Sequence, residues 1–177
     1  MPEPEQLRAN LEIKARCADL ESARKLAAAL ATEHVGVDHQ LDTYFTTARG
    51  RFKLRESSLS GGQLVPYLRP DQHGPKRADY RVIPVADPPG VKALLSEILG
   101  VHRVVEKERE IFLVDNVRIH LDRVKGLGTF LELEAVFDGS PGGEAEQRQK
   151  VDWLMQELGV EAGDLLATSY EELAADP

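Results

Sequence analysis

Charged side chains alternate with apolar ones in about six segments of the sequence, and this pattern limits the fold more than any other feature. Successive side chains of a β-strand point to opposite faces of the sheet. In residues 8–17, for example, Glu12 and Lys14 share one face, while Leu11 and Ile13 share the other. We therefore expect a sheet with one apolar face and one strongly charged face.

Between these segments, apolar residues recur every three or four positions, which is typical of amphipathic helices. Asp19 and Asp87 can cap a first helical turn, and Gly100 and Gly159 can end a helix. Strands and helices do not alternate strictly, so the sequence predicts an α+β fold with a mostly antiparallel sheet. The expected strands are 8–17, 37–47, 51–57, 63–69, 79–86, 101–114, 116–125 and 129–137, the expected helices are 19–31, 87–99, 144–158 and 164–173, and a polar mobile loop is expected at 70–77.

Two interpretations of the charged face differ in where that face lies. A half-buried antiparallel sheet usually turns its polar face to solvent. Here the middle strands, such as 51–57, carry cations, whereas the first and last strands carry carboxylates, and arginine is frequent. The amphipathic helices also need an apolar surface to cover. We therefore favour a closed barrel with the charges inside and the helices packed on the outside.

The bulk composition excludes several classes of protein. The 177 residues favour a single domain, 1–177, with a core at about 8–173. The net charge of −8 argues against a nucleic-acid surface and against a membrane-binding patch. No apolar run is long enough to span a membrane, and the acidic N-terminus does not resemble a signal peptide. Cys17 is the single cysteine, so an internal disulfide is excluded and a cytoplasmic location is expected.

A confined space lined by many cations needs a compensating ligand, because like charges repel and each loses hydration. Triphosphate carries about four negative charges at neutral pH, and Mg²⁺ prefers carboxylate and phosphate oxygens. Lys and Arg beside paired carboxylates are therefore the residue types that phosphoryl chemistry requires. The charged face predicts a site for a small-molecule triphosphate with a divalent metal.

Several motifs resemble, in order, those of the CYTH domain or triphosphate tunnel metalloenzyme superfamily, which is named for class IV adenylyl cyclase and thiamine triphosphatase. The resemblance covers nearly the whole chain and is greatest to the class IV adenylyl cyclase-like proteins. It implies an eight-stranded antiparallel β-barrel with inward-facing charge. The motifs are 10–14 (NLEIK), 42–45 (DTYF), 53–55 (KLR), 67–69 (YLR), 105–109 (VEKER), 118–122 (RIHLD), 126–128 (GLG), 132–134 (ELE) and 169–173 (SYEEL).

The resemblance also implies roles for individual residues. Carboxylates would hold Mg²⁺ or Mn²⁺, cations would hold the phosphates, and four of these residues would form the catalytic set. The implied metal ligands are Glu12, Glu132, Glu134 and nearby Asp122, with Asn10 at the first signature position. The implied triphosphate ligands are Lys14, Lys53, Arg55, Arg69, Lys107, Arg109 and Arg118, with Lys76 and Arg81 near a loop at the mouth. The implied catalytic set is Glu12, Lys14, Arg55 and Arg109.

Asn10 is a departure from the family pattern, which has Glu at this position. An amide oxygen can coordinate a metal, but it brings no charge. We therefore expect the metal affinity, or the occupancy of a second metal site, to differ from that of relatives.

Three activities fit this set of residues. In the first, a ribose hydroxyl of ATP attacks the α-phosphorus, which gives cyclic AMP and pyrophosphate. In the second, water attacks inorganic triphosphate, thiamine triphosphate or a nucleoside triphosphate. In the third, the protein binds a polyphosphate or nucleotide without turnover. The resemblance favours cyclisation and suggests a homodimer, and a pocket for a base at the mouth would distinguish the first two activities.

Overall fold

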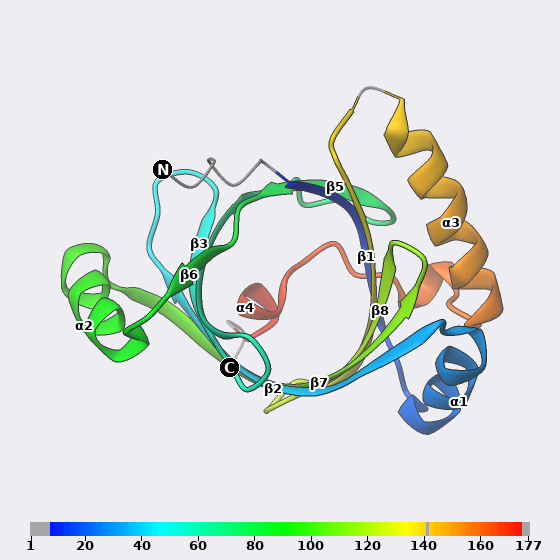
Figure 1. Cartoon of the computed structure of the whole chain (residues 1–177), viewed down its shortest axis with the longest axis horizontal. Helices are drawn as coiled ribbons and strands as arrows, with labels where there is room; N and C mark the ends of the chain where they lie inside the picture. Colours follow the sequence, from blue (N-terminus) through cyan, green and yellow to red (C-terminus); the bar gives the residue numbers. More distant parts are fainter. Residues whose placement is uncertain (1–7, 141, 175–177) are drawn as a thin grey trace.

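A computed structural model describes residues 8–140 and 142–174, and its central element is a closed antiparallel β-barrel (Figure 1). Eight strands follow one another in the order β3-β2-β7-β8-β9-β1-β5-β4, and pairing of β4 with β3 closes the ring. The predicted eight-stranded barrel is confirmed, and an additional strand, β6, pairs with β4. The strands are β1 (Arg8–Arg16), β2 (Glu33–Phe45), β3 (Arg51–Ser57), β4 (Gly61–Leu68), β5 (Lys76–Tyr80), β6 (Ile83–Val85), β7 (Val101–Val114), β8 (Val117–Val124) and β9 (Gly128–Phe137).

The strand register brings charged residues of neighbouring strands together on the inner face. Glu12 of β1 lies opposite Glu134 of β9, and Lys14 lies opposite Glu132. On the other edge of β9, Arg118 of β8 lies opposite Glu134. Charged residues that are far apart in the sequence therefore meet, because the register of neighbouring strands places their charged positions on the same face of the sheet.

The main apolar core lies on the outer face of β1, β8 and β9, where α1 (Leu20–Leu30) and α3 (Gly143–Glu157) cover the sheet (Figure 1). Leu11, Leu133 and Leu154 are fully buried in this layer. Burial of each such side chain stabilises the fold by about 1.5–3 kcal/mol. The prediction that helices cover the apolar face of the barrel is confirmed for these two helices.

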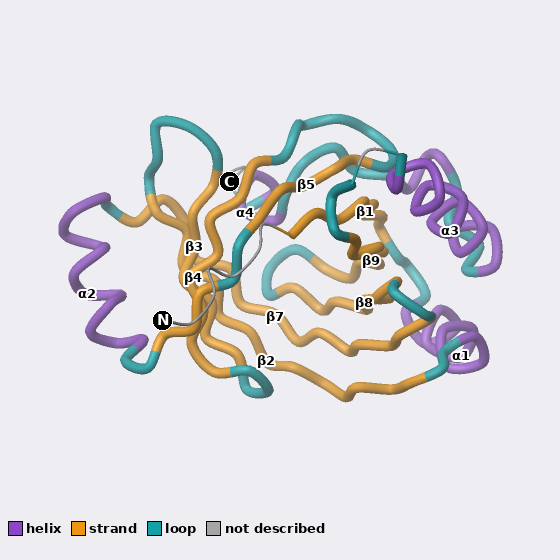
Figure 2. The backbone as a smooth tube through the Cα atoms, turned by 45° about the horizontal axis from the view of Figure 1, so that its top comes forward, coloured by secondary structure: helices purple, strands orange, loops and turns teal. Residues whose placement is uncertain are grey.

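Helix α2 (Pro88–Leu99) has the predicted position in the sequence and packs on the outside of β2 and β3, with part of its apolar stripe left uncovered. It lies on the opposite side from α1 and α3 (Figure 2), and Leu94 and Ile98 of its apolar stripe are 62% and 65% exposed. The helix follows β6 closely and leads directly into β7 at Val101. These short connections hold α2 at one edge of the barrel, where it contacts β2 and β3 but covers the sheet less completely than α1 and α3 do.

The C-terminal segment also differs from the prediction of one helix over 164–173. A short 3₁₀ turn (Ala162–Asp164) is followed by extended chain, and α4 covers only Tyr170–Leu173. The backbone N–H of Leu166 donates to the carbonyl of Lys14, 2.8 Å away, and Leu165 forms a bridge with β1. Pairing with β1 therefore replaces helix in this segment and carries the chain into the barrel, where α4 lies (Figure 1).

One end of the barrel interior is filled by α4 and by aromatic side chains. Tyr44, Val105, Phe130 and Tyr170 form a buried apolar cluster there, and Leu173 packs against it. The rings of Phe130 and Tyr170 are 4.9 Å apart. The protein's own C-terminal segment thus occupies this end of the interior.

The strand expected at 79–86 is divided into β5 and β6, and β5 begins inside the loop that was expected at 70–77. β5 pairs with both β1 and the end of β4, whereas β6 pairs with an earlier part of β4. The division after Tyr80 allows the chain to change partners. It is this short β5 that joins β1 to β4 and completes the ring.

Candidate functional site

The barrel encloses a cavity of about 480 Å³ that receives side chains from all eight strands of the ring. Cations and carboxylates make up much of its lining, as the alternation in the sequence predicted. The predicted site residues that line it are Asn10, Glu12, Lys14, Lys53, Arg55, Arg69, Lys107, Arg109, Arg118, Glu132 and Glu134.

Asp42 of β2 is the centre of a cationic wall. Its carboxylate is fully buried and accepts two hydrogen bonds of 2.7 Å from Arg55 and one of 2.8 Å from Lys53. The amine of Lys107 lies 3.7 Å from the same carboxylate. Burial alone would raise the pKa of Asp42, but Arg55, Lys53 and Lys107 outweigh it and hold this pKa well below its usual value. One negative charge therefore holds three cations in place and leaves excess positive charge beside the cavity.

Arg109 of β7 is held by Asp122 of β8, directly opposite it in the register. Its guanidinium donates to both carboxylate oxygens at 2.7 and 2.6 Å, and the hydroxyl of Tyr170 donates to one of them at 2.7 Å. Burial opposes ionisation of Asp122, but Arg109 more than offsets it and lowers the pKa to about 2. Asp122 is fully buried and lies behind Arg109, outside the cavity lining. It fits the role of orienting Arg109 better than that of a metal ligand.

The opposite side of the cavity is acidic. Glu12 and Glu134 lie opposite each other on β1 and β9, an arrangement that is unfavourable for like charges unless cations compensate it. Glu12 contacts Arg69 at 2.7 Å, and Glu134 contacts Arg118 at 3.3 Å. Asn10 donates its amide to Glu134 at 2.8 Å, while its own oxygen Oδ1 is buried without a hydrogen-bond partner.

Glu132 joins the acidic side to the cations. It lies 3.2 Å from the amine of Lys14 and 3.4 Å from Arg109. Lys14 in turn lies over the ring of Tyr170 at 3.9 Å. His120 is buried 3.5 Å from Glu132, and burial together with Arg109 lowers the pKa of His120, which favours the neutral imidazole. Both sides of the cavity are therefore connected through Glu132.

The acidic side fits a divalent cation that a substrate completes. Among residues 8–140 and 142–174, no three acidic, His or Cys side chains are arranged as a full metal site. Glu12, Glu134 and the unpartnered oxygen of Asn10 supply two carboxylates and one neutral oxygen. Mg²⁺ is commonly bound by one or two carboxylates together with substrate phosphates. These three residues fit such an ion.

The cavity lining also contains an apolar group, away from the end that α4 occupies. The side chains are Val35, Leu59, Val82, Ile111 and Leu113. Val35 and Leu59 are exposed although both are aliphatic. Val35 and Leu113 belong to paired ends of β2 and β7, so the apolar group lies at one mouth of the barrel. We call these five residues the apolar rim.

Two residues expected at the phosphate site do not line the cavity. Lys76 is almost fully buried, and its amine donates to the carbonyls of Leu166 and Ala167 at 3.1 and 2.8 Å. Burial and the charge of Arg69 lower the pKa of Lys76 to about 8. Arg81 is exposed between β5 and β6. Lys76 thus attaches the C-terminal segment to β5, and Arg81 lies outside the cavity lining.

Four residues of the cavity region were given no individual role by the sequence interpretation, although two of them belong to the motif 42–45. Asp38, Gln40, Asp42 and Tyr44 occupy alternate positions of β2 and all are buried. The alternation that places Lys53 and Arg55 on the inner face of β3 also places these four residues on the inner face of β2. Asp, Gln and Tyr do not attract phosphate, so a pattern of cations alone does not predict a role for them.

A closed antiparallel barrel with cations and carboxylates inside defines a class of tunnel proteins that bind polyanions. A sequence model of the CYTH domain matches residues 8–170, and the chain belongs to this family. No protein with a curated description matches the sequence.

Solved structures show the same fold. PH1012 protein from Pyrococcus horikoshii OT3 is 25% identical with a TM-score of 0.76, over 93% of this chain and 98% of that one. A candidate adenylate cyclase from Vibrio parahaemolyticus is 20% identical with a TM-score of 0.75, over 98% and 100% of the two chains. HpAC1 from Hippeastrum, described as having a dominant triphosphatase activity, is 15% identical with a TM-score of 0.58, over 94% and 93%. Among the described residues, no helix is long and apolar enough to cross a membrane.

Proposed function

We propose that this protein binds a nucleoside triphosphate in the barrel and converts ATP to cyclic AMP and pyrophosphate with the help of Mg²⁺ or Mn²⁺. The observation that supports this most is the arrangement of cations around Asp42 and Asp122, opposite the pair Glu12 and Glu134. The apolar rim favours an organic triphosphate over an inorganic one, because it offers contact area that phosphate cannot use.

In the proposed mechanism, Lys53, Arg55, Lys107 and Arg109 bind the phosphates and stabilise negative charge on the leaving pyrophosphate. Glu12 and Glu134, with Asn10, would hold the metal ion, which supplies Lewis acidity at a phosphate oxygen. Lys14 is positioned by Glu132 and by the ring of Tyr170 to contact a phosphate oxygen near the acidic side. The C-terminal segment at that end of the barrel would limit the access of bulk water to the phosphate site.

Hydrolysis of an organic triphosphate is the second candidate activity. HpAC1 shares the fold and is described as mainly a triphosphatase, and the same cations and metal would serve attack by water.

The predicted homodimer, the cytoplasmic location and the lack of nucleic-acid binding stay predictions.

One assay tests the proposal. Purified protein is incubated with ATP or inorganic triphosphate and Mg²⁺ or Mn²⁺, and the products are separated by chromatography. Cyclic AMP with pyrophosphate is the expected result. Release of orthophosphate would show that the protein hydrolyses the triphosphate instead of cyclising it. Binding without any product would show that the protein binds nucleotides without turnover.

Asn10→Glu should increase the affinity for Mn²⁺ by about tenfold, because a third carboxylate adds attraction at the acidic side. The same change should lower the stability of the metal-free protein, since the new charge meets Glu134 in place of the amide that now donates to it. Electron paramagnetic resonance of free Mn²⁺ gives the affinity without any need for turnover. Asn10→Ala, which removes the oxygen, should weaken Mn²⁺ binding. Equal Mn²⁺ titrations for all three proteins would refute this assignment.

Triphosphate binding near pH 8 should take up protons. Burial and the neighbouring charge of Arg55 lower the pKa of Lys53 to about 8, and burial with Arg109 lowers the pKa of Lys107 well below its usual value. A bound polyanion raises both pKa values, so about one proton is taken up. Titration calorimetry in two buffers of different ionisation enthalpy measures this number. Lys53→Arg should reduce the uptake, and identical heats in both buffers would contradict the expected coupling.

The lowered pKa of Lys53 also makes the free energy of unfolding depend on pH. Between pH 8 and 10.5 an unfolded Lys53 is largely protonated while the folded one is largely neutral, so unfolding takes up protons. The contribution of Lys53 to the free energy of unfolding therefore rises with pH across this window.

A further inference from the structure

Gln40 of β2 faces the cavity with one polar atom that has no partner. The residue is 5% exposed, and its amide nitrogen Nε2 donates to Asp38 at 2.7 Å. Its oxygen Oε1 is buried and has no hydrogen-bond partner among the described residues. A buried acceptor left unpaired costs about 1–3 kcal/mol. Gln40 lines the same cavity as the cations, so a ligand in that cavity can supply the missing donor.

The direction of this amide is fixed by Asp38. The Asp38 carboxylate also accepts hydrogen bonds from the hydroxyls of Ser57 and Ser58 and from the backbone N–H of Leu59. Because an ionised carboxylate only accepts, the nitrogen of Gln40 must face Asp38 and the oxygen must face away from it. The turn that carries Leu59, a residue of the apolar rim, is thus connected to the amide of Gln40.

A phosphate group is the wrong partner for this oxygen. Ionised phosphate oxygens are acceptors, and two acceptors placed together repel each other. Along β2, Gln40 lies between Asp42, which holds the phosphate-binding cations, and Val35 of the apolar rim. A ligand whose phosphates contact the cations around Asp42 must therefore present an N–H or O–H group to Gln40 from the part of the ligand next to the phosphates.

We propose that Gln40 and the apolar rim form a subsite for the organic part of the substrate, in which Oε1 of Gln40 accepts a hydrogen bond from a hydroxyl or amino group of the nucleoside. This inference rests on the proposed triphosphate function and deepens it. Asp38 acts as a positioning residue that holds the amide. The subsite favours nucleotides with a donor next to the triphosphate over inorganic triphosphate.

The experiment measures binding by titration calorimetry without divalent metal, so that no turnover occurs. The ligands are ATP, 2′-deoxy-ATP, 3′-deoxy-ATP, inosine triphosphate and inorganic triphosphate, and the proteins are wild type, Gln40→Met and Gln63→Met. Gln63 also lines the cavity, from β4, so its variant controls for loss of an amide from the wall. Wild type should bind the one analogue that lacks the recognised donor roughly tenfold more weakly than ATP. Weaker binding of inosine triphosphate would identify the amino group of the base as the recognised donor. Weaker binding of a deoxy analogue would identify the hydroxyl that it lacks.

In Gln40→Met, the preference of ATP over that analogue should disappear, while inorganic triphosphate should bind as in wild type. Gln63→Met should retain the preference for ATP over that analogue. If no analogue binds wild type more weakly than ATP, the subsite is refuted even if Gln40→Met fails to fold. An equal loss for ATP and inorganic triphosphate in Gln40→Met would also refute it. Failure of wild type to bind any triphosphate would instead refute the proposed function.

Discussion

Asp42→Asn should lower the free energy of unfolding of the ligand-free protein by about 3–5 kcal/mol, because it removes one partner of a buried ion cluster. Asp42 is fully buried and is the carboxylate shared by Lys53, Arg55 and Lys107. An asparagine of the same shape leaves these cations without compensation in a poorly hydrated place. Urea denaturation followed by circular dichroism measures the change.

Inorganic triphosphate should restore much of this loss, because it supplies the missing negative charge to the same cations. Asp79→Asn is the matched control: Asp79 pairs with Arg77 in a largely solvated ion pair, and its loss should cost less than about 1 kcal/mol. If Asp42→Asn were as stable as the control, or if triphosphate stabilised the variant no more than it stabilises wild type, the cluster would not be the phosphate site.

Arg109→Ala should weaken triphosphate binding by about 100-fold, because a buried, oriented guanidinium is lost from the cavity wall. Asp122 and Tyr170 hold Arg109 in one orientation, so little ordering is needed when a ligand arrives. Arg109→Lys should recover only part of the affinity, since an ammonium group cannot reproduce the planar fork. Fluorescence competition with a labelled nucleotide measures these affinities.

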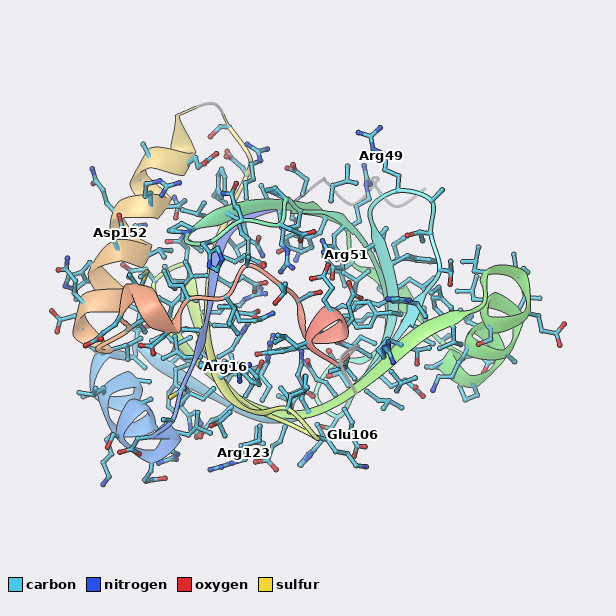
Figure 3. All side chains as sticks on the ribbon, turned by 180° about the vertical axis from the view of Figure 1, so that it is seen from behind. Arg16, Arg49, Arg51, Glu106, Arg123 and Asp152 are labelled. Atoms are coloured by element: carbon cyan, nitrogen blue, oxygen red, sulfur yellow. The ribbon has the colours of Figure 1, made fainter. Side chains whose placement is uncertain are left out.

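Arg123→Ala is the control for this prediction. Arg123 follows Asp122 on β8 but points away from the barrel (Figure 3), so its removal changes the net charge equally without touching the cavity. Its affinity should stay within about twofold of wild type. Circular dichroism confirms that Arg109→Ala is folded before binding is compared. Equal affinities of the two alanine variants would show that charge at Arg109 has no special role.

The sequence predicted the barrel and most of its lining because both follow from one local rule. Alternation alone places Lys53, Arg55 and Arg109 on one face, and closure of the sheet then turns that face inward. The rule does not predict contacts between elements that are distant in the chain. Besides Arg109, Asp122 has Tyr170 as a partner, 48 residues later, and no local pattern connects Asp122 with Tyr170.

The same reason explains the remaining errors. Residues 164–173 have the composition of a helix, but pairing of Leu165 and Leu166 with β1 is stronger than that local preference. Lys76 looked like a phosphate ligand because it is a cation beside a loop, yet the carbonyls of the C-terminal segment take up its amine. Tertiary contacts decided both cases.

For the proposed cyclase activity, the position of α4 inside one end of the barrel has a consequence for the order of product release. Tyr44 and Tyr170 lie next to the amines of Lys53 and Lys14, so the phosphate chain of a nucleotide bound as proposed would be its deepest part. A nucleotide that entered with its phosphates first through the mouth at the apolar rim would leave by the same mouth in the reverse order. In the proposed cyclisation, the cyclic nucleotide would therefore depart before pyrophosphate, and pyrophosphate would compete directly with the next ATP.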